Sequence, residues 1–520
     1  MQPSSRELAA SIGRNTVFGV IANATVIATR LITVPIVIHH LGLDGYGIWS
    51  IIMVTAGYMR FGTAGIKSAF QKYVAEATGT GDYETANVLL STGSICILVL
   101  SVVGLVPVTL FAKSLARASG VPPQFLLAAA ASIAVLALTY AVANFGFAFE
   151  AIVMGGHRMD LTRKCSALLT LSEAVAIIAV LELGYGLLAM TVVMALSELI
   201  YVVYSFHMSR KIVPQVRIRL RSFETRVFPE LVRFAGSYQL VNIFEMVYGA
   251  ILPIALLKFF GATAAGIAAV ATRLVGAALI AQDALILPIL SGGTVIFATQ
   301  SAEKLKLFLT KSFKMTLAVA LPPLAIACAF GTTIVMAWTG ESAPEFGVAI
   351  WLTALAGLLR AIARLQLVLY RASGKALMDN IREVLRIVAI FGVVLFSKNI
   401  GFAGVLAGMA FAELAGVVFM FFAMSSTLRT LDSRAMIQDT LRVLAATLLL
   451  VVAGAIPQLL SPHARIDTRW TATLRLGEIG LLCLIFVWPA LVFTNALSSS
   501  ERRMIRDSIF SSRRTLVPNE

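Results

Sequence analysis

The sequence predicts an all-α integral membrane protein of about 14 transmembrane helices, built as two six-helix lobes followed by two C-terminal helices. Three observations predict this class. The 520-residue chain is 58% hydrophobic and only 13% charged, against roughly 25% charged residues in soluble domains. Its mean hydropathy is +0.88. Its apolar residues also form blocks of about 20, the length of helix that crosses a bilayer core of roughly 30 Å.

Fourteen apolar blocks follow one another along the chain. The first six predicted spans are 16–38, 46–66, 88–112, 124–154, 166–184 and 186–206. The next six are 232–257, 264–290, 312–337, 347–370, 381–397 and 402–424, and the last two are 439–460 and 473–495. This order predicts an N-terminal lobe over 1–206, a basic linker over 207–231, a C-terminal lobe over 232–424, two further spans within 425–495 and a basic tail over 496–520.

The cations predict the orientation in the membrane. With the N-terminus in the cytoplasm, inner segments hold 28 of the 42 Lys and Arg residues, outer loops hold 7 and the spans hold the other 7. Because cytoplasmic loops carry an excess of Lys and Arg, we expect both termini in the cytoplasm. Topology and contact with anionic lipids thus account for most of the net charge of +15, and we expect no nucleic-acid partner.

A short pattern recurs at a distance of six spans. Spans one and two are joined through Pro35-Ile36, Gly42 and Gly47-Ile48, and spans seven and eight through Pro253-Ile254, Gly261 and Gly266-Ile267. The distance from proline to first glycine differs by one residue, and the period is near 218 residues. Repeats separated by an even number of spans have the same orientation, so the pattern predicts two lobes related by a pseudo-two-fold axis along the membrane normal.

Seven cations lie inside predicted spans, where an Arg costs about 2.5–3.5 kcal/mol on insertion scales unless it faces protein or water. They are Arg30, Arg60, Arg273, Arg360, Arg364, Arg386 and Arg442. Arg386 follows Glu383 by one turn, and Arg442 lies near a span end from which it can reach the interface. Both are therefore interpreted as structural.

The other five cations are candidates for binding an anion. Arg30, Arg60 and Arg273 have no acidic residue three or four positions away, and their expected depths are staggered, with Arg30 nearest the outer side and Arg60 nearest the inner side. The planar guanidinium suits phosphate oxygens. The alternative is that each pairs with an acid on another helix, such as Glu245, Glu150 or Glu198. Arg360 and Arg364 share a helix face, and either extend the anion site or pair with Glu413.

Acids inside spans are candidates for H⁺ or Na⁺ coupling. They are Glu150, Glu173, Glu198, Glu245, Asp283 and Glu413, of which we expect Glu245, Asp283 and Glu150 to act in coupling. Glu245 follows Tyr238 and Asn242 on one polar stripe, although it serves equally well as a counter-ion for an arginine. The sequence has no ATP-binding loop and no His or Cys cluster with metal-ligand spacing. We therefore expect no enzyme activity, catalytic residue, metal or cofactor.

Two segments carry a family resemblance. HHLGLDGYGIWSI, at the turn between spans one and two, and the following loop KYVAEATGTGDYETANVLLSTG resemble the signature of Wzx-type polysaccharide flippases, in the multidrug/oligosaccharidyl-lipid/polysaccharide exporter superfamily. The resemblance lies mainly in residues 14–95. It implies a two-lobed fold that alternates between inward-open and outward-open states. It also implies, from the arginines that the lipid II flippase branch carries in spans one, two and eight, that Arg30, Arg60 and Arg273 contact a pyrophosphate.

The resemblance further implies a bacterial inner membrane and an undecaprenyl-pyrophosphate-linked oligosaccharide as the substrate. Together with the cations inside the spans, it predicts a flippase that moves this lipid to the outer leaflet, for surface polysaccharide, exopolysaccharide or O-antigen assembly. The alternatives are a multidrug cation antiporter of the same superfamily, a lipid II flippase, and a membrane scaffold without transport activity. The expected partners are the lipid-linked substrate and membrane lipids, with a polysaccharide polymerase and glycosyltransferases as further candidates. We expect a monomer.

Overall fold

The computed structural model describes residues 5–60, 64–282, 302–372, 377–423, 433–461 and 468–496, with a few positions between 285 and 296 and position 502. All regular structure in these residues is helical. The chain forms two compact units: Met1–Ala269 with Glu383–Val405, and Val270–Arg382 with Leu406–Glu520. The predicted lobe boundaries at 206 and 232 remain a prediction.

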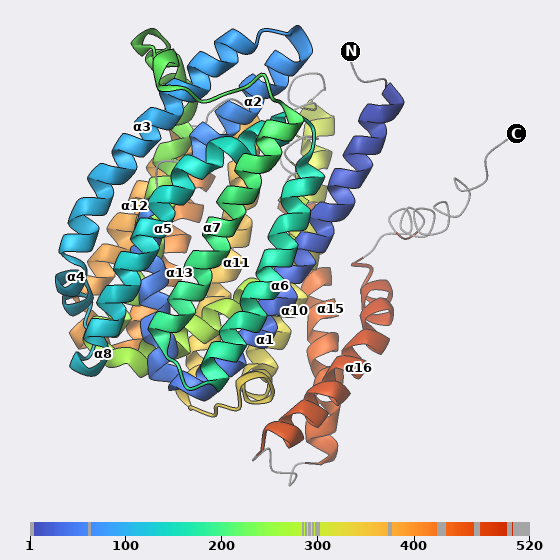
Figure 1. Ribbon diagram of the computed structural model, residues 1–520. Coiled ribbons are helices and arrows are strands. Elements are labelled where there is room, and N and C mark those ends of the chain that lie inside the picture. The colour runs from blue at the N-terminus through green and yellow to red at the C-terminus, as the bar shows by residue number, and fades with distance from the viewer. Residues whose placement is uncertain are drawn as a thin grey trace, which may run out of the picture. The chain divides into compact units, whose positions relative to one another are not determined.

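The first unit holds most of the N-terminal helices (Figure 1). They are α1 (Ser5–Gly57), η1 (Tyr58–Arg60), α2 (Ala64–Thr80), α3 (Tyr83–Leu110), α4 (Ala112–Ala118), α5 (Pro123–Gly155), α6 (Met159–Glu182), α7 (Leu187–Ile212), η2 (Leu220–Ser222) and η3 (Thr225–Val227). Helix α5 packs on α7 and α3, and α1 packs along α6. Phe70 of α2, Leu90 of α3 and Ile152 of α5 belong to one buried hydrophobic cluster, which holds these three helices together.

The second unit is also a helical bundle. Its helices include α10 (Ala302–Thr339), α11 (Glu345–Ala372), α15 (Ser433–Leu460) and α16 (Arg469–Phe493). Three more helices cross the boundary between the units: α8 (Phe228–Ala278), α12 (Leu377–Leu395) and α13 (Ser397–Ala423). Helix α10 packs against α11, α15 and α16. Leu317 of α10 and Leu450 of α15 are buried in a common core cluster.

Eleven helices in the described residues are long and apolar enough to cross a membrane. Two of them, α1 and α8, are broken by a glycine into two long arms, and α13 has a similar break at Gly401, four residues after its start. Helix α12 falls outside the eleven because Asp379, Arg382, Glu383 and Arg386 interrupt its apolar sequence. Counting the arms of α1 and α8 separately and adding α12 brings the eleven to fourteen, the number of spans that the sequence predicts.

The breaks in α1 and α8 occur at the two glycines that the repeat aligns. Gly42 has φ 68° and ψ 174°, and Gly261 has φ 88° and ψ 178°. A positive φ brings the Cβ of other residues too close to the backbone, whereas glycine adopts it at little cost. Each glycine therefore ends one arm and allows the next to begin at a sharp angle.

Near these breaks the arms of α1 and α8 pack reciprocally. A Cβ at Gly47 would lie 2.2 Å from the carbonyl oxygen of Ala262, and a Cβ at Gly266 would lie 2.3 Å from that of Leu43. The Thr263 hydroxyl donates a hydrogen bond of 2.6 Å to Asp44 Oδ1. Positions 43, 44 and 47 precede 262, 263 and 266 by the same interval, so equivalent positions meet, as they do across a two-fold axis. The local packing confirms the predicted repeat.

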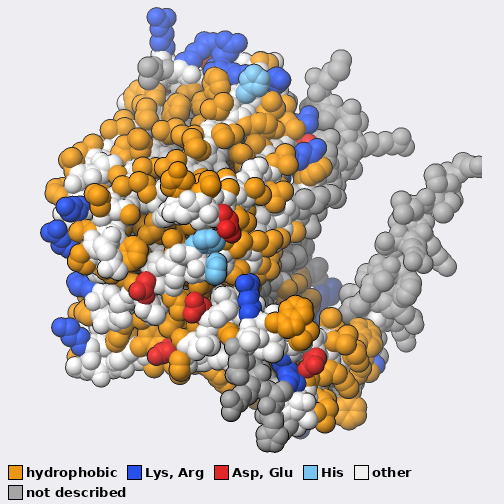
Figure 2. Space-filling view, turned by 60° about the horizontal axis from the view of Figure 1, so that its bottom comes forward, with side chains coloured by type: hydrophobic (Ala, Val, Ile, Leu, Met, Phe, Trp, Pro, Cys, Tyr) orange, Lys and Arg blue, Asp and Glu red, His pale blue; other side chains and the backbone are white. Residues whose placement is uncertain are grey.

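Large apolar side chains remain on the protein surface. Leu127, Leu168 and Phe422 are more than 60% exposed, with many others like them. Figure 2 shows hydrophobic side chains over most of the face drawn. A soluble protein rarely exposes so much contiguous apolar surface, whereas helices in lipid present it to the acyl chains. This surface fits a multi-pass membrane protein.

Candidate functional site

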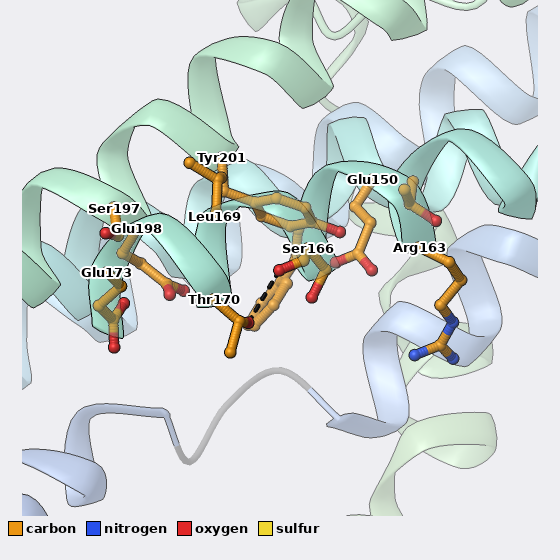
Figure 3. A pocket seen from close by; sticks show the side chains of 11 residues that line it. Glu150, Arg163, Ser166, Leu169, Thr170, Glu173, Ser197, Glu198 and Tyr201 are labelled. Carbon is orange, nitrogen blue, oxygen red and sulfur yellow. Dashed lines mark hydrogen bonds between the residues drawn. The ribbon is translucent and has the colours of Figure 1, made fainter. Parts of the chain in front are cut away.

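A cavity of about 240 Å³ lies among α5, α6 and α7 in the first unit (Figure 3). Three glutamates line it, one from each helix: Glu150, Glu173 and Glu198. Hydroxyl groups and a single arginine, Arg163, complete the polar lining. The sequence predicts Glu150 as a coupling residue, and the structure places it with two further carboxylates.

Helix α6 supplies a polar stripe to the cavity wall. Ser166, Thr170 and Glu173 are spaced by four and three residues, which puts them on one face of a helix. The Thr170 hydroxyl donates a hydrogen bond of 2.8 Å to the carbonyl oxygen of Ser166 (Figure 3). With its donor used in its own helix, Thr170 turns only acceptor capacity towards the cavity.

Helices α5 and α7 approach closely beside the cavity because α5 has a glycine there. A Cβ at Gly146 would lie 2.6 Å from the side chain of Val202. Glu150 follows Gly146 by one turn, and Tyr201 precedes Val202, so the close approach brings these two side chains together. The Tyr201 hydroxyl and the Glu150 carboxylate lie close enough to interact. Gly146 thereby positions the most buried acid of the cavity.

The cavity carries an excess of negative charge. Glu150 is only 9% exposed, and Glu173 and Glu198 are half-buried. The Ser197 hydroxyl donates to Glu173, and the Glu198 carboxylate is near enough to repel that of Glu173. Because Arg163 is exposed, it compensates little of this charge. Such a lining suits a cation and disfavours a phosphate.

A second polar cluster lies inside the second unit, where two arginines share one glutamate. Arg360 Nε donates to Glu413 Oε1 at 2.9 Å, and Arg382 Nη2 donates to Glu413 Oε2 at 3.1 Å. Glu413 is fully buried and Arg382 is 2% exposed, while Arg360 is 36% exposed. Of the two readings for Arg360, pairing with Glu413 is the one observed. Arg364 is half-buried one turn farther along α11.

Arg386 is held in the first unit by the local pair that the sequence predicts. Its Nη1 donates to Glu383 Oε2 at 2.5 Å, and both side chains are buried. The guanidinium also lies 3.8 Å from the ring centroid of Tyr248 on α8, a favourable stacking geometry. Arg442 likewise pairs with Asp439 at 3.1 Å on α15.

Arg30 and Arg273 occupy corresponding distances along their helices. Arg30 lies twelve residues before Gly42 on α1, and Arg273 lies twelve residues after Gly261 on α8, each about 18 Å of helix from its break. Arg30 precedes its break whereas Arg273 follows its own, so the two are not equivalent positions of the repeat, and the expected staggering of depths remains a prediction. Arg30 is exposed and Arg273 half-buried.

Arg60 lies at the end of η1, and its side chain is outside the described residues. The backbone of η1 is held by Asn144 of α5, whose Nδ2 donates to Met59 O at 2.5 Å and to Ser101 Oγ at 3.0 Å. A helix that ends inside a bundle leaves carbonyl oxygens without helical partners. Asn144 thus stabilises the turn that carries Arg60, a role that sequence reasoning missed.

Of the remaining predicted coupling residues, Glu245 is not among the residues that line the cavity. Glu245 on α8 is exposed, and Asn242 beside it is half-buried. Asp283 lies outside the described residues. Sequence reasoning therefore found Glu150 but not its grouping with Glu173, Glu198 and Tyr201. The signal was the polar stripe of Ser166, Thr170 and Glu173 in an otherwise apolar span.

Comparison with solved structures identifies the fold. A lipid II flippase MurJ in an inward closed conformation matches with a TM-score of 0.68 and 13% identity, over 92% of this chain and 99% of that one. An inward-facing multidrug resistance MATE transporter of the MOP superfamily matches with a TM-score of 0.62 and 16% identity, over 80% and 96%. A MOP superfamily transporter from Pyrococcus furiosus, whose binding pocket is described as of reverse polarity, matches at 0.59 and 16%, over 81% and 96%.

No protein-family model and no curated protein matches the chain. At these identities the likeness shows the fold, which is that of MOP superfamily transporters. The neighbours are transporters and not enzymes. Together with the eleven apolar helices, they indicate a multi-pass membrane protein.

Proposed function

We propose that the protein is a flippase that carries an undecaprenyl-pyrophosphate-linked oligosaccharide from the inner to the outer leaflet by alternating access. The observation that carries the proposal is an arginine inside each of two long apolar helices, Arg30 twelve residues before the break at Gly42 of α1 and Arg273 twelve residues after the break at Gly261 of α8. The guanidinium group suits the oxygens of a pyrophosphate. The fold shared with a lipid II flippase over 92% of the chain supports the same class of substrate.

Arg60 and the pair Arg360 and Arg364 have different parts in this proposal. Arg60 follows Gly42 by eighteen residues, which puts it about 27 Å of helix from the break, where it would meet the headgroup on entry. Arg360 already shares Glu413 with Arg382. Arg360 would therefore bind phosphate only if the phosphate replaced the Glu413 carboxylate as its partner. Arg364 would extend the same face of α11.

We propose that the glutamate cavity supplies the coupling. Glu150, Glu173 and Glu198 line a space of about 240 Å³, below the roughly 300–1,000 Å³ of pockets that hold drug-sized ligands. A Na⁺ ion with its remaining waters, or protons on the carboxylates, fits this volume and charge. Glu245 and Asp283 remain candidates for the same role at other positions.

In the cell this function would place the chain in a bacterial inner membrane with both termini in the cytoplasm. It would act as a monomer beside glycosyltransferases and a polysaccharide polymerase, in the assembly of surface polysaccharide, exopolysaccharide or O-antigen. The Wzx-type signature in residues 14–95 supports this placement among the superfamily's branches.

Reconstitution into liposomes tests the proposal. The full chain is compared with Arg30→Ala, Arg60→Ala and Arg273→Ala for transfer of a fluorescent lipid-pyrophosphate oligosaccharide. We expect at least a tenfold loss of rate in Arg30→Ala and Arg273→Ala, since each removes a charge-assisted contact worth about 1.5–3 kcal/mol. Wild-type rates in all three folded variants would reject the cationic path. Transfer of lipid II in preference to other oligosaccharides would assign the lipid II branch.

A second candidate function, multidrug cation antiport, is favoured by the acidic cavity. Organic cations bind where carboxylates and aromatic rings meet, and Tyr201 and Phe147 lie beside the three glutamates. The volume of the cavity weighs against a large drug. Ethidium efflux from liposomes that is lost in Glu150→Gln would support this function over the first.

A further inference from the structure

The segment that joins α7 to α8, residues 213–227, is an ordered strap on the first unit. Two short helical turns, η2 and η3, lie within it. In Figure 1 it is the green segment at the upper end of α3. From the sequence this segment is a basic linker whose cations, like those of the other inner segments, mark topology and contact anionic lipids; its ordered backbone is not predicted, and the proposed function makes no use of it.

Side chains of α3 hold the backbone of the strap. Asn87 accepts a hydrogen bond of 2.6 Å from Arg217 N and donates one of 3.2 Å to Gln215 O. One turn farther along α3, Ser91 Oγ accepts from Arg219 N at 3.0 Å. Two extended residues advance by roughly 6.6 Å, close to the pitch of one helical turn, about 5.4 Å. Alternate strap amides therefore meet successive turns of α3.

The same alternation buries one side of the strap. Val213 is 3% exposed and Val216 only 1%, in the cluster that contains Phe70 and Leu90. Ile218 and Val227 pack against this cluster. Near the end of the strap, Thr92 Oγ1 accepts a further hydrogen bond of 3.0 Å from Glu224 N. The strap thus has a fixed inner face and a fixed outer face.

The outer face is strongly basic. Arg217, Arg219, Arg221 and Arg226 are exposed, and Lys211 is exposed in the last turn of α7. Glu224, in contact with Arg226, is the only acid between 211 and 227. Phe223 adds an apolar ring that is 41% exposed among these cations.

We propose that the strap is a docking surface for anionic phospholipid headgroups. It begins where α7 ends and stops where α8 begins, and both helices are long and apolar enough to cross a membrane, which would put its cations beside the membrane surface. Each Lys or Arg near an anionic leaflet contributes about 1 kcal/mol. An exposed aromatic among cations is typical of segments that lie in the interface. Because α3 holds the backbone, the lipids bind at a defined place on the first unit.

A titration with phosphatidylglycerol tests the proposal. The full-length protein in detergent micelles is titrated with this lipid, and bound copies are counted by native mass spectrometry. In Arg217→Gln/Arg219→Gln we expect the affinity to fall about thirtyfold, because two contributions of about 1 kcal/mol are lost and 1.4 kcal/mol is tenfold. Phosphatidylcholine binding should not change.

The matched control is Lys113→Gln/Arg117→Gln on α4, at the other end of α3. This pair is also exposed and also consists of two cations, and a micelle gives the lipid access to both ends. We expect the control variant to bind phosphatidylglycerol like the wild type. An equal loss in both variants, or no loss in the strap variant, would overturn the proposal.

A second variant tests whether lipid binding depends on the attachment of the strap backbone to α3. Asn87→Ala/Ser91→Ala keeps every cation but removes the hydrogen bonds that hold residues 217 and 219. We expect faster deuterium uptake at these two amides and weaker phosphatidylglycerol binding. Faster uptake with unchanged binding would show that a loose basic segment suffices, which contradicts a built surface.

Discussion

Two groups of charged side chains, each carried by three helices, arrange their acids in opposite ways. In the first unit, α5, α6 and α7 turn three glutamates into a cavity of about 240 Å³. In the second unit, Glu413 of α13 is fully buried and bonded to Arg360 of α11 and Arg382 of α12. The first group lines a space of the size of a small cation with its waters, and the second uses its carboxylate on its own arginines.

The difference shows how to separate structural from functional charges in a membrane protein. A buried pair recovers the cost of desolvation only through close geometry, so Glu413 has little left to offer a ligand. The cavity acids face one another with one exposed arginine near them, which leaves negative charge that a bound cation would neutralise. Removing an acid should therefore have opposite effects on stability in the two groups.

The largest effect is expected for Glu413→Gln. Arg382 is 2% exposed, and without the carboxylate its charge stays buried and poorly compensated, which costs about 3–5 kcal/mol when a buried pair is broken. Thermal unfolding in detergent measures the loss. Glu345→Gln, at the exposed start of the same α11 that carries Arg360, is the control and should unfold like the wild type. Equal unfolding temperatures for both variants would contradict the assignment.

The next largest effect is expected where α1 and α8 pack reciprocally, at Gly47 and Gly266. Gly47→Ala places a Cβ 2.2 Å from Ala262 O, and relief of this contact has to move backbone, at about 1–3 kcal/mol for an overpacked site. Gly266→Ala should behave alike, because it meets Leu43 O in the same way. Gly249→Ala, whose Cβ would meet nothing within 4 Å, is the control. Wild-type stability of both close-contact variants would contradict the reciprocal packing of α1 and α8.

A smaller effect, of opposite sign to the first, is expected in the cavity. Glu198→Gln removes a charge that repels Glu173, so the free energy of unfolding should rise by less than about 1 kcal/mol. Wild-type protein should melt at a higher temperature in NaCl than in choline chloride, since a bound ion stabilises the folded state. Glu150→Gln should lose that difference. A marked destabilisation by Glu198→Gln would mean that this acid is a structural partner like Glu413.

The smallest effect is expected for Asp82, an acid outside the spans, which serves as a reference for the acids inside them. Asp82 accepts a hydrogen bond of 3.1 Å from Thr85 N at the start of α3, and bonds to Thr85 lower the pKa of Asp82. A lowered pKa stabilises the fold above the unfolded value of about 3.9, and the effect is lost as pH falls through the folded value. The protection of the Thr85 amide from deuterium exchange, relative to its intrinsic rate at each pH, should fall at acid pH in wild type. Uptake in Asp82→Asn should not depend on this titration.

The fold could be predicted almost entirely from sequence, because span length and the distribution of cations follow directly from the bilayer. The positions of Gly42 and Gly261 even located the repeat. The grouping of Glu150, Glu173 and Glu198 could not be predicted, because it depends on the close approach of α5 and α7 at Gly146. The partner of Arg360 stayed open for the same reason, since Glu413 is 53 residues away in the chain.

The measurement that tests the central claim most directly compares lipids of different charge in one reconstituted system. Liposomes with wild-type protein, Arg273→Gln or the control Arg442→Gln receive the same oligosaccharide on a pyrophosphate, a monophosphate or an uncharged polyprenyl carrier. We predict that wild type and Arg442→Gln transfer the pyrophosphate form fastest, and that Arg273→Gln loses at least tenfold of that preference, about 1.4 kcal/mol. Equal transfer of all three lipids by wild type, or an unchanged preference in Arg273→Gln, would contradict a path built for an anion.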